Sequence, residues 1–352
     1  MSFQTAMPDW LFRSQNPAFT VKDNLITACN QAAEAMLVTP DTDVRSLLLT
    51  GKEEYAAFQG GCLYLKLSLS SRGCGAVVTR EGDTDVFLLE QEPAEAELRS
   101  LSLAARELRN PLSNLIIAAD GLARQTNDDP AVQEWLARLN RGLNQIHRLV
   151  NNMSDASRSD LLSPVGMHDW SRLVYEIFEK IQTRLSDTHV TLDFEVPQEP
   201  VYGYANAGQM ERAILNIVSN AMKFMPEGGH IHAVLTRRQN MLHLSIQDSG
   251  SGIAQNVLGN VFTRYRRQPG IEDSRYGLGL GMVLIRSTAA DHGGTVLIDC
   301  PEGTGTRVTM TMAIRQEGTC LKTPIVPALA DESRNILLEL SDCLPWEYYK
   351  KS

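Results

Sequence analysis

The chain has 352 residues, which is enough for two or three domains that each bury their own core. Its apolar fraction of 43% and charged fraction of 21% are those of an ordinary globular protein. The net charge of −9 argues against nucleic acid or an anionic membrane as the main partner, because both attract basic surfaces. No apolar run reaches the roughly 18 residues of a membrane span. The first residues also lack the pattern of a signal peptide, so we expect a cytoplasmic protein.

Cysteine and histidine positions exclude several kinds of site. The six cysteines are scattered without a Cys-x-x-Cys pair, which predicts neither a disulfide framework nor a zinc site. All seven histidines lie at or beyond His147. The first 146 residues therefore offer no imidazole as a nucleophile or haem ligand.

Residues 1–92 predict a compact mixed segment. Phe19–Val21 and Leu25–Cys29 are expected to be strands joined by a Lys-Asp-Asn turn, and three further strand-like runs follow: CLYLKLSL, GAVVTR and TDVFLLE. This order of elements resembles a PAS sensor domain. A dimerising spacer that binds no ligand explains the same pattern equally well.

Residues 93–160 predict two long helices in an antiparallel hairpin. Apolar residues recur at alternating steps of three and four, the rhythm of helices packed in a bundle. One hairpin leaves its apolar seam half exposed, so we expect two hairpins to pair as a four-helix bundle, in a homodimer or a heterodimer with a relative. The alternative is an intramolecular hairpin capped by another domain. The seam residues are Leu98, Leu101, Ala105, Leu108, Leu112, Leu115, Ala119 and Leu122, then Val132, Leu136, Leu139, Leu143, Ile146, Val150 and Met153.

Residues 161–315 alternate between helical and strand patterns, which predicts a two-layer α/β sandwich. The whole chain is therefore expected to be an α+β multidomain protein. The expected helices are Leu173–Leu185, Gln209–Phe224 and Met282–Asp291, and the expected strands are Val190–Val196, Ile231–Thr236, Leu242–Gln247, Val296–Asp299 and Arg307–Ile314. Residues 316–352 predict a tail with a short helix near Ser333–Asp342, which either docks on the body or binds a partner.

Four sequence blocks in the sandwich carry chemistry. They are Asn216–Phe224, Asp248–Ile253, Val261–Arg267 and Gly277–Met282, and Gly303–Thr306 completes the series before the last strand. Any one of them is weak evidence alone. Together, in this order and spacing, they resemble the Bergerat-type ATP-binding domain shared by histidine kinases, gyrase-type ATPases and Hsp90-like chaperones.

The resemblance implies a role for each block. Asn216, Asn220 and Lys223 lie at i, i+4 and i+7 on one helical face. The amide oxygen of Asn220 suits Mg²⁺, and Lys223 supplies a charge for a phosphate. Asp248 is expected to accept the exocyclic amine of adenine, while its neighbours let the backbone turn towards the base. Those neighbours are Gly250, Gly252 and Ile253.

The remaining blocks are expected to complete the nucleotide site. Phe262 is the packing residue of the third block, whose arginines are candidates for phosphate contact. Backbone N–H groups of a glycine-rich loop before a helix can hold phosphates. Gyrase-type ATPases carry a water-activating glutamate where this chain has Asn216, so the pocket is expected to hold ATP for transfer and not for that hydrolysis. The loop residues and the last expected ATP contact are Gly277, Leu278, Gly279, Gly281 and Thr306.

The first long helix contains LAARELRNPLSNL, residues 103–115. This run resembles the phosphoacceptor box of sensor histidine kinases, in which Glu107, Asn110, Pro111 and Leu112 all match. Arg106 stands where the family has its phosphorylated histidine. A guanidinium is always protonated and only donates hydrogen bonds, so we expect no autophosphorylation at this position.

Three functions follow from the resemblance. A pseudokinase or scaffold binds Mg-ATP and acts through a response regulator receiver domain or a kinase partner. A phosphatase uses Glu107 and Asn110 to position water for a receiver aspartate. A histidine protein kinase phosphorylates a partner's histidine in trans. We expect His147 to be a bundle-surface residue and His292 to cap or pack, so neither is expected to replace the acceptor.

Overall fold

The computed structural model describes residues 16–69, 72–90, 95–125, 129–156, 165–225, 227–254, 261–262, 280–301, 305–315 and 332–350. They belong to two compact units, each made of segments that are far apart in the sequence. The first unit comprises Met1–Glu92, Val234–Thr263 and Arg286–Ile314. The second comprises Pro93–Ala233, Arg264–Ile285 and Arg315–Ser352.

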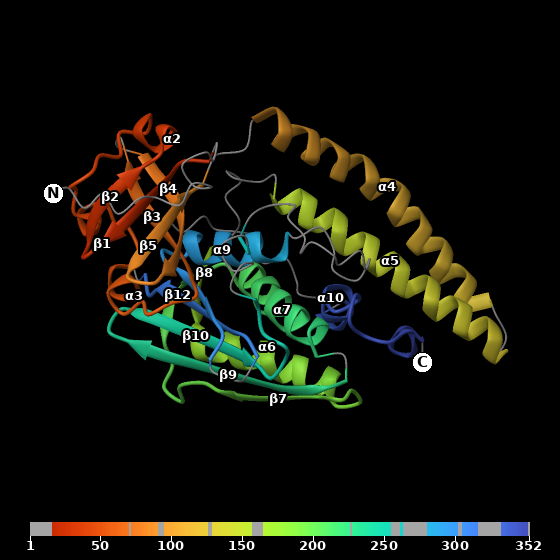
Figure 1. Cartoon of the computed structure of the whole chain (residues 1–352). Helices are drawn as coiled ribbons and strands as arrows, with labels where there is room; N and C mark the ends of the chain where they lie inside the picture. The colour runs from red at the N-terminus through yellow and green to blue at the C-terminus, as the bar shows by residue number, and fades with distance from the viewer. Residues whose placement is uncertain are drawn as a thin grey trace. The chain divides into compact units, whose positions relative to one another are not determined.

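The amino-terminal part of the first unit is a five-stranded antiparallel sheet with strand order β2-β1-β5-β4-β3 (Figure 1). The predicted turn between the first two strands is confirmed, with Asp23 and Asn24 both at positive φ. Short helices that sequence periodicity did not predict connect β2 to β3. The bounds are β1 Ala18–Lys22, β2 Leu25–Cys29, α2 Gln31–Glu34, η1 Val44–Ser46, α3 Lys52–Ala56, β3 Cys62–Leu69, β4 Arg72–Glu81 and β5 Thr84–Leu89.

Aromatic packing and one partly buried ion pair hold this sheet together. Phe19 stacks on Phe87 with ring centroids 4.7 Å apart. The Tyr55 hydroxyl donates to Asp85 at 3.0 Å, and Arg80 donates to the other oxygen of the same carboxylate at 2.7 Å. This network joins α3, β4 and β5, so the predicted compact segment has a core of its own.

Strand pairing within the first unit continues past the amino-terminal sheet. β3 pairs antiparallel with β11, Val296–Asp299, so that Tyr64 lies opposite Val296. β11 pairs with β12, Arg307–Ala313, which pairs with β10, Met241–Asp248. The sequence placed these strands in two expected domains and did not predict their pairing, because no local pattern indicates that two edge strands will meet.

The second unit contains the predicted helical hairpin, α4 Glu95–Gln125 and α5 Pro130–Ala156 (Figure 1). Pro111 lies within α4, which continues through it. The heptad prediction holds in detail, because the seam divides into two rows that are each spaced by seven residues. The buried row is Ala105, Leu112 and Ala119 on α4 with Leu136, Leu143 and Val150 on α5, whereas Leu108, Leu115, Leu122, Leu139 and Ile146 are exposed.

Two helices of the predicted sandwich lie in the second unit: α6, Trp170–Leu185, and α7, Ala207–Lys223. Side-chain oxygens cap both helices: Asp169 accepts from the backbone N–H of Ser171, and Asn206 accepts from that of Gln209. The predicted strands at these positions are present as β7, Val190–Glu195, and β9, Gly229–Arg238, which are neighbours in the sheet. A short antiparallel pair, β6 Gly166–Asp169 with β8 Tyr202–Ala205, was not predicted.

The carboxyl-terminal tail packs on the second unit, as the docking prediction requires. It forms α10, Glu332–Glu339, and η3, Trp346–Tyr349. α10 contacts α5, α6 and α7, and η3 contacts α5. Ile336, Leu338, Leu340 and Leu344 are buried, and these apolar side chains anchor the tail.

Candidate nucleotide-binding site

Helix α7 places the three predicted side chains on one face, as the spacing requires. Asn216 is fully buried, and its Nδ2 donates to the backbone carbonyl of Arg212 at 2.8 Å. The amide of Asn220 donates to the sulfur of Met282 at 3.3 Å. Lys223, at the end of the helix, donates from Nζ to Asp342 at 3.0 Å. The polar face of α7 therefore carries two amides and a cation in order along the helix.

Gly281 begins α9, Gly281–Asp291, and approaches α7 closely. A Cβ atom at this position would lie 3.0 Å from Oδ1 of Asn216, which is tighter than ordinary packing allows. Asn216 and Gly281, each predicted as an ATP contact, therefore lie close together in the second unit. The other predicted loop residues, Gly277, Leu278 and Gly279, lie outside the described residues.

Asp248 ends β10 in the first unit, and its carboxylate is held by backbone groups. Oδ1 accepts from the N–H of Gly250 at 2.8 Å and from the N–H of Thr306 at 3.0 Å. Burial raises the pKa of Asp248, while these two hydrogen bonds act in the opposite direction because they favour the carboxylate. Gly252 follows at positive φ, and the backbone N–H of Ile253 donates to Sγ of Cys300 at 3.3 Å.

Gly305 explains how the Asp248 loop is closed. Its φ is +48°, and a Cβ atom there would collide with the backbone carbonyl and the carboxylate of Asp248. The backbone of Asp248 in turn donates to the carbonyl of Thr306 at 2.9 Å. Only glycine fits this crossing of two chain segments. Asp248, Gly250 and Thr306, each predicted as an ATP contact, are therefore joined by hydrogen bonds within the first unit.

Two further predictions about packing are confirmed. Phe262 is buried, with its ring centroid 5.8 Å from that of Tyr64. His292 is buried after α9, and its Nδ1 lies 2.7 Å from the carbonyl of Thr288, so the imidazole caps the helix end. The arginines of the third block lie outside the described residues.

The acceptor box lies on the exposed side of α4. Arg106, Glu107 and Asn110 are all exposed, while Ala105 and Leu112 turn into the hairpin. Glu107 and Asn110 are three residues apart and so share a face of the helix. His147 lies on α5 and is partly buried.

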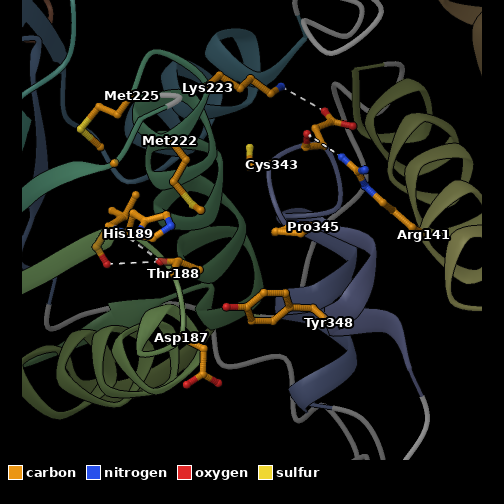
Figure 2. A pocket seen from close by; sticks show the side chains of 13 residues that line it. Arg141, Asp187, Thr188, His189, Met222, Lys223, Met225, Cys343, Pro345 and Tyr348 are labelled. Carbon is orange, nitrogen blue, oxygen red and sulfur yellow. Dashed lines mark hydrogen bonds and ion pairs between the residues drawn. The ribbon is translucent and has the colours of Figure 1, made fainter. Parts of the chain in front are cut away.

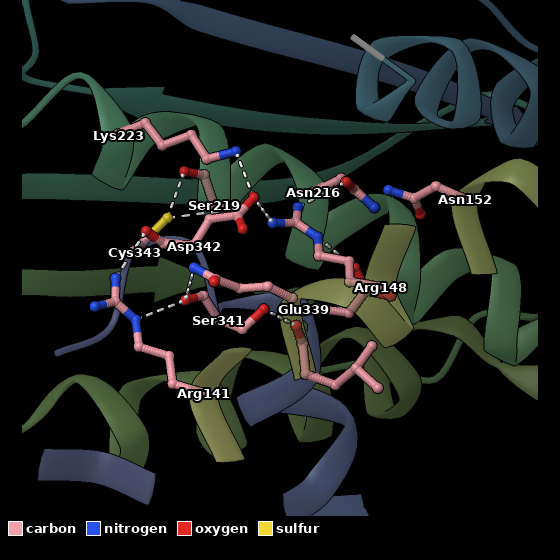
Figure 3. A network of polar contacts seen from close by, with 12 residues as sticks. Arg141, Arg148, Asn152, Asn216, Ser219, Lys223, Glu339, Ser341, Asp342 and Cys343 are labelled. Atoms are coloured by element: carbon pink, nitrogen blue, oxygen red, sulfur yellow. Dashed lines mark hydrogen bonds and ion pairs between the residues drawn. The ribbon is translucent and has the colours of Figure 1, made fainter. Parts of the chain in front are cut away.

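A polar network that sequence analysis missed surrounds the face of α7 (Figure 3). Arg148 of α5 is only 6% exposed and donates to Oδ1 of Asn216 at 3.0 Å. The same guanidinium donates to Glu339 at 3.1 Å and to Asp342 at 2.8 Å. Arg148 lies 194 positions from Asp342 and 68 from Asn216, so no local pattern could have indicated these contacts.

A cavity of about 290 Å³ lies beside Lys223 in the second unit. Figure 2 shows Met222 and Met225 on one side of the cavity and Tyr348 opposite. Lys223 and Asp342, which are joined by an ion pair, also line it. Because Asp342 and Tyr348 belong to the tail, docking of the tail forms part of this cavity. Within the part of the chain that the structure describes, no cluster of His, Cys, Asp or Glu has the makings of a metal site, and no helix suits a membrane span.

Comparison with known proteins supports the family suggested by these motifs. The model of the His Kinase A (phospho-acceptor) domain matches residues 97–161. The model of the histidine kinase-, DNA gyrase B- and HSP90-like ATPase matches residues 205–316, which include both the α7 face and the Asp248 loop. The chain belongs to the sensor histidine kinase family.

Individual relatives agree with this assignment. The chain is 30% identical over 238 residues to the adaptive-response sensory kinase SasA of Crocosphaera subtropica, covering 64% of this chain and 61% of that protein. It is 29% identical over 237 residues to the sensor histidine kinase WalK of Bacillus subtilis, covering 65% of this chain and 38% of WalK. It thus spans less than two thirds of the length of either relative.

A solved structure shares the fold. Full-length ShkA, crystallised in complex with AMPPNP, aligns with a TM-score of 0.51 at 20% identity, covering 63% of this chain and 47% of ShkA. The predicted fold class, a mixed α/β protein with a helical hairpin and an ATPase-type sandwich, is confirmed.

Proposed function

We propose that this chain is a two-component signalling protein that binds Mg-ATP but does not phosphorylate itself at the usual helix position. The observation that carries this proposal is the exposed Arg106 on an otherwise complete acceptor helix. Its guanidinium has no lone pair for attack on a phosphorus atom. The motifs for nucleotide binding are nevertheless retained.

The site residues fit a magnesium nucleotide. Nδ2 of Asn220 is used by Met282, which leaves the amide oxygen, a ligand type that Mg²⁺ favours, for an ion. Asp248 offers Oδ2 to an adenine amine, because Oδ1 already accepts from Gly250 and Thr306. ATP would supply a transferable γ-phosphoryl group, while Lys223 and the α9 N-terminus hold phosphate charge.

We further propose the domain organisation predicted above: a PAS-like sensor at 1–92, a helical hairpin at 93–160, an ATP-binding domain at 161–315 and a tail at 316–352. The exposed heptad row of α4 and α5 supports pairing of two hairpins in a four-helix bundle, because exposed apolar rows at this spacing are buried by a second hairpin. The partner hairpin comes from a second copy or from a related kinase. A response regulator receiver domain is the proposed downstream partner.

Two modes of action remain open beside the scaffold. Exposed Glu107 and Asn110 on one face of α4 support a phosphatase that orients water at a receiver aspartate. A complete nucleotide site would also support phosphorylation in trans of a histidine on a heterodimer partner. Both modes leave Arg106 without a chemical step.

The first test is Mg-ATP binding by isothermal titration calorimetry. We expect micromolar to millimolar affinity for the unaltered chain and at least a tenfold loss in Asn220→Ala. Asn240→Ala, an exposed residue in the turn after β9, is the matched control and should bind like the unaltered chain. Equal binding by all three proteins, or by none, would refute the proposed site.

A further inference from the structure

The last described segment of the chain contacts both α5 and α7. Side chains that are three, four or seven positions apart on α5 face it, and so do side chains at the same spacing on α7. Arg141 and Gln145 donate to the carbonyl of Ser341, each at 3.2 Å. On the other side, Arg212 donates to Glu339 at 3.2 Å. The tail thus bridges the helical hairpin and the helix that carries the predicted magnesium ligand.

One carboxylate oxygen is the centre of this bridge (Figure 3). Oδ2 of Asp342 accepts from Nζ of Lys223 at 3.0 Å and from Nη1 of Arg148 at 2.8 Å. Lys223 is only 9% exposed and Arg148 6%, so the tail excludes solvent from both cations. An anionic oxygen shared by a lysine and an arginine is also the arrangement that binds a phosphate oxygen.

The residues that bind the tail carry more positive charge than the tail neutralises. Four cations donate hydrogen bonds to the segment, whose acidic partners in these contacts are Glu339 and Asp342; the cations are Arg141, Arg148, Arg212 and Lys223. The docked state therefore keeps an excess of positive charge among these six groups. A polyphosphate carries more charge than one carboxylate, so it can displace Asp342 from Lys223.

We infer that the tail is an autoinhibitory latch: Asp342 occupies the cation pair Lys223 and Arg148 in place of a nucleotide phosphate, and nucleotide binding and tail docking exclude each other at Lys223. This inference rests on the proposed function, since it takes Lys223 to be a phosphate-binding residue. When the latch is closed, the tail ties α5 to α7 and Lys223 is not available to ligand. When nucleotide displaces Asp342, the tie through this carboxylate is lost.

The test compares the dissociation constant for Mg-AMPPNP in three full-length proteins at one ionic strength. Asp342→Asn removes the charge while keeping the shape, so we expect it to bind at least fivefold more tightly than the unaltered chain. Glu347→Gln is the matched control, because it removes the same charge from an exposed position of the same tail. It should bind within twofold of the unaltered chain.

Hydrogen exchange of residues 332–350 in the unaltered chain is a second measurement, and it does not depend on whether a variant folds. We expect Mg-AMPPNP to increase exchange there. If the unaltered chain binds nucleotide and tail exchange does not change, or if Asp342→Asn binds no more tightly, the latch is refuted while nucleotide binding stands. If no protein binds, including Asp342→Asn, both the proposed function and the latch fail.

Discussion

Asp248 and Lys223 are both expected to contact nucleotide, yet the structure holds them in different ways. Asp248, in the first unit, is fixed by two backbone N–H groups and by a glycine crossing that admits no side chain. Lys223, in the second unit, is fixed by a side chain from the distant tail. Backbone groups position Asp248, one of them from the distant Thr306, whereas a side-chain ion pair positions Lys223.

This difference indicates which of the two residues can exchange its contacts when a ligand binds. Backbone hydrogen bonds and a tight crossing keep Asp248 in place whatever the ligand, because moving it requires the chain itself to move. An ion pair can instead be exchanged for another anion at little cost in covalent or backbone geometry. Regulation is therefore expected at Lys223, and constant recognition at Asp248.

The first prediction concerns the ion pairs of Arg148 in the second unit, where we expect the greatest loss of stability. Arg148→Met removes a buried guanidinium that contacts Glu339, Asp342 and Asn216. Because two carboxylates then lose their shared partner, the free energy of unfolding should fall by about 3–5 kcal/mol. Urea unfolding measures this loss. Arg172→Met, which removes an exposed arginine paired with Glu176 on α6, should change it by less than about 1 kcal/mol.

The second prediction concerns the backbone crossing that holds Asp248 in the first unit. Gly305→Ala forces an alanine to positive φ and drives its Cβ into the backbone of Asp248. Strain of about 1–2 kcal/mol and displacement of about 1–3 kcal/mol should together destabilise the protein by about 2–5 kcal/mol. Gly82→Ala is the control, since φ is +61° there but no atom lies within 4 Å of the added Cβ. Equal losses in the two variants would show that the crossing is not tight.

The third prediction concerns the pH dependence of stability at Asp248, for which we expect a smaller effect. Burial raises the pKa of this carboxyl, so the folded state holds the proton more tightly than the unfolded state does. Its contribution to stability is then present below the ordinary carboxyl pKa of about 3.9 and is lost as pH rises through the raised value. Asp248→Asn lacks this term. The difference in unfolding free energy, unaltered chain minus variant, should therefore decrease with rising pH, whereas an increase would mean that the backbone donors outweigh burial.

Local patterns in the sequence predicted much of this protein. The strand CLYLKLSL is β3 to the residue, and Val296–Asp299 is β11. The heptad rhythm of α4 and α5 predicted which seam is shared between the helices. The spacing of Asn216, Asn220 and Lys223 predicted one helical face. Each of these depends on periodicity or on neighbours within one element, which is why sequence alone was sufficient.

Contacts between distant segments could not be predicted in this way. The pairing of β3 with β11 joins two strands whose patterns only say that each is buried. Arg148 was indistinguishable from the other arginines of α5, and Asp342 from an ordinary polar residue at a helix end. Their meeting depends on where the tail docks, and this is set by the apolar side chains of Ile336, Leu338, Leu340 and Leu344.

We propose that this chain keeps the nucleotide site of a histidine kinase, while Arg106 removes its phosphoacceptor. The most direct measurement is labelling with γ-phosphate-labelled ATP at saturating nucleotide, comparing the unaltered chain, Arg106→His and Arg106→His with Asn220→Ala. Because Arg106 is exposed, the histidine should be tolerated. We predict acid-labile phosphate only on Arg106→His with Asn220 intact. Labelling of the unaltered chain, or no labelling of Arg106→His, would contradict the account.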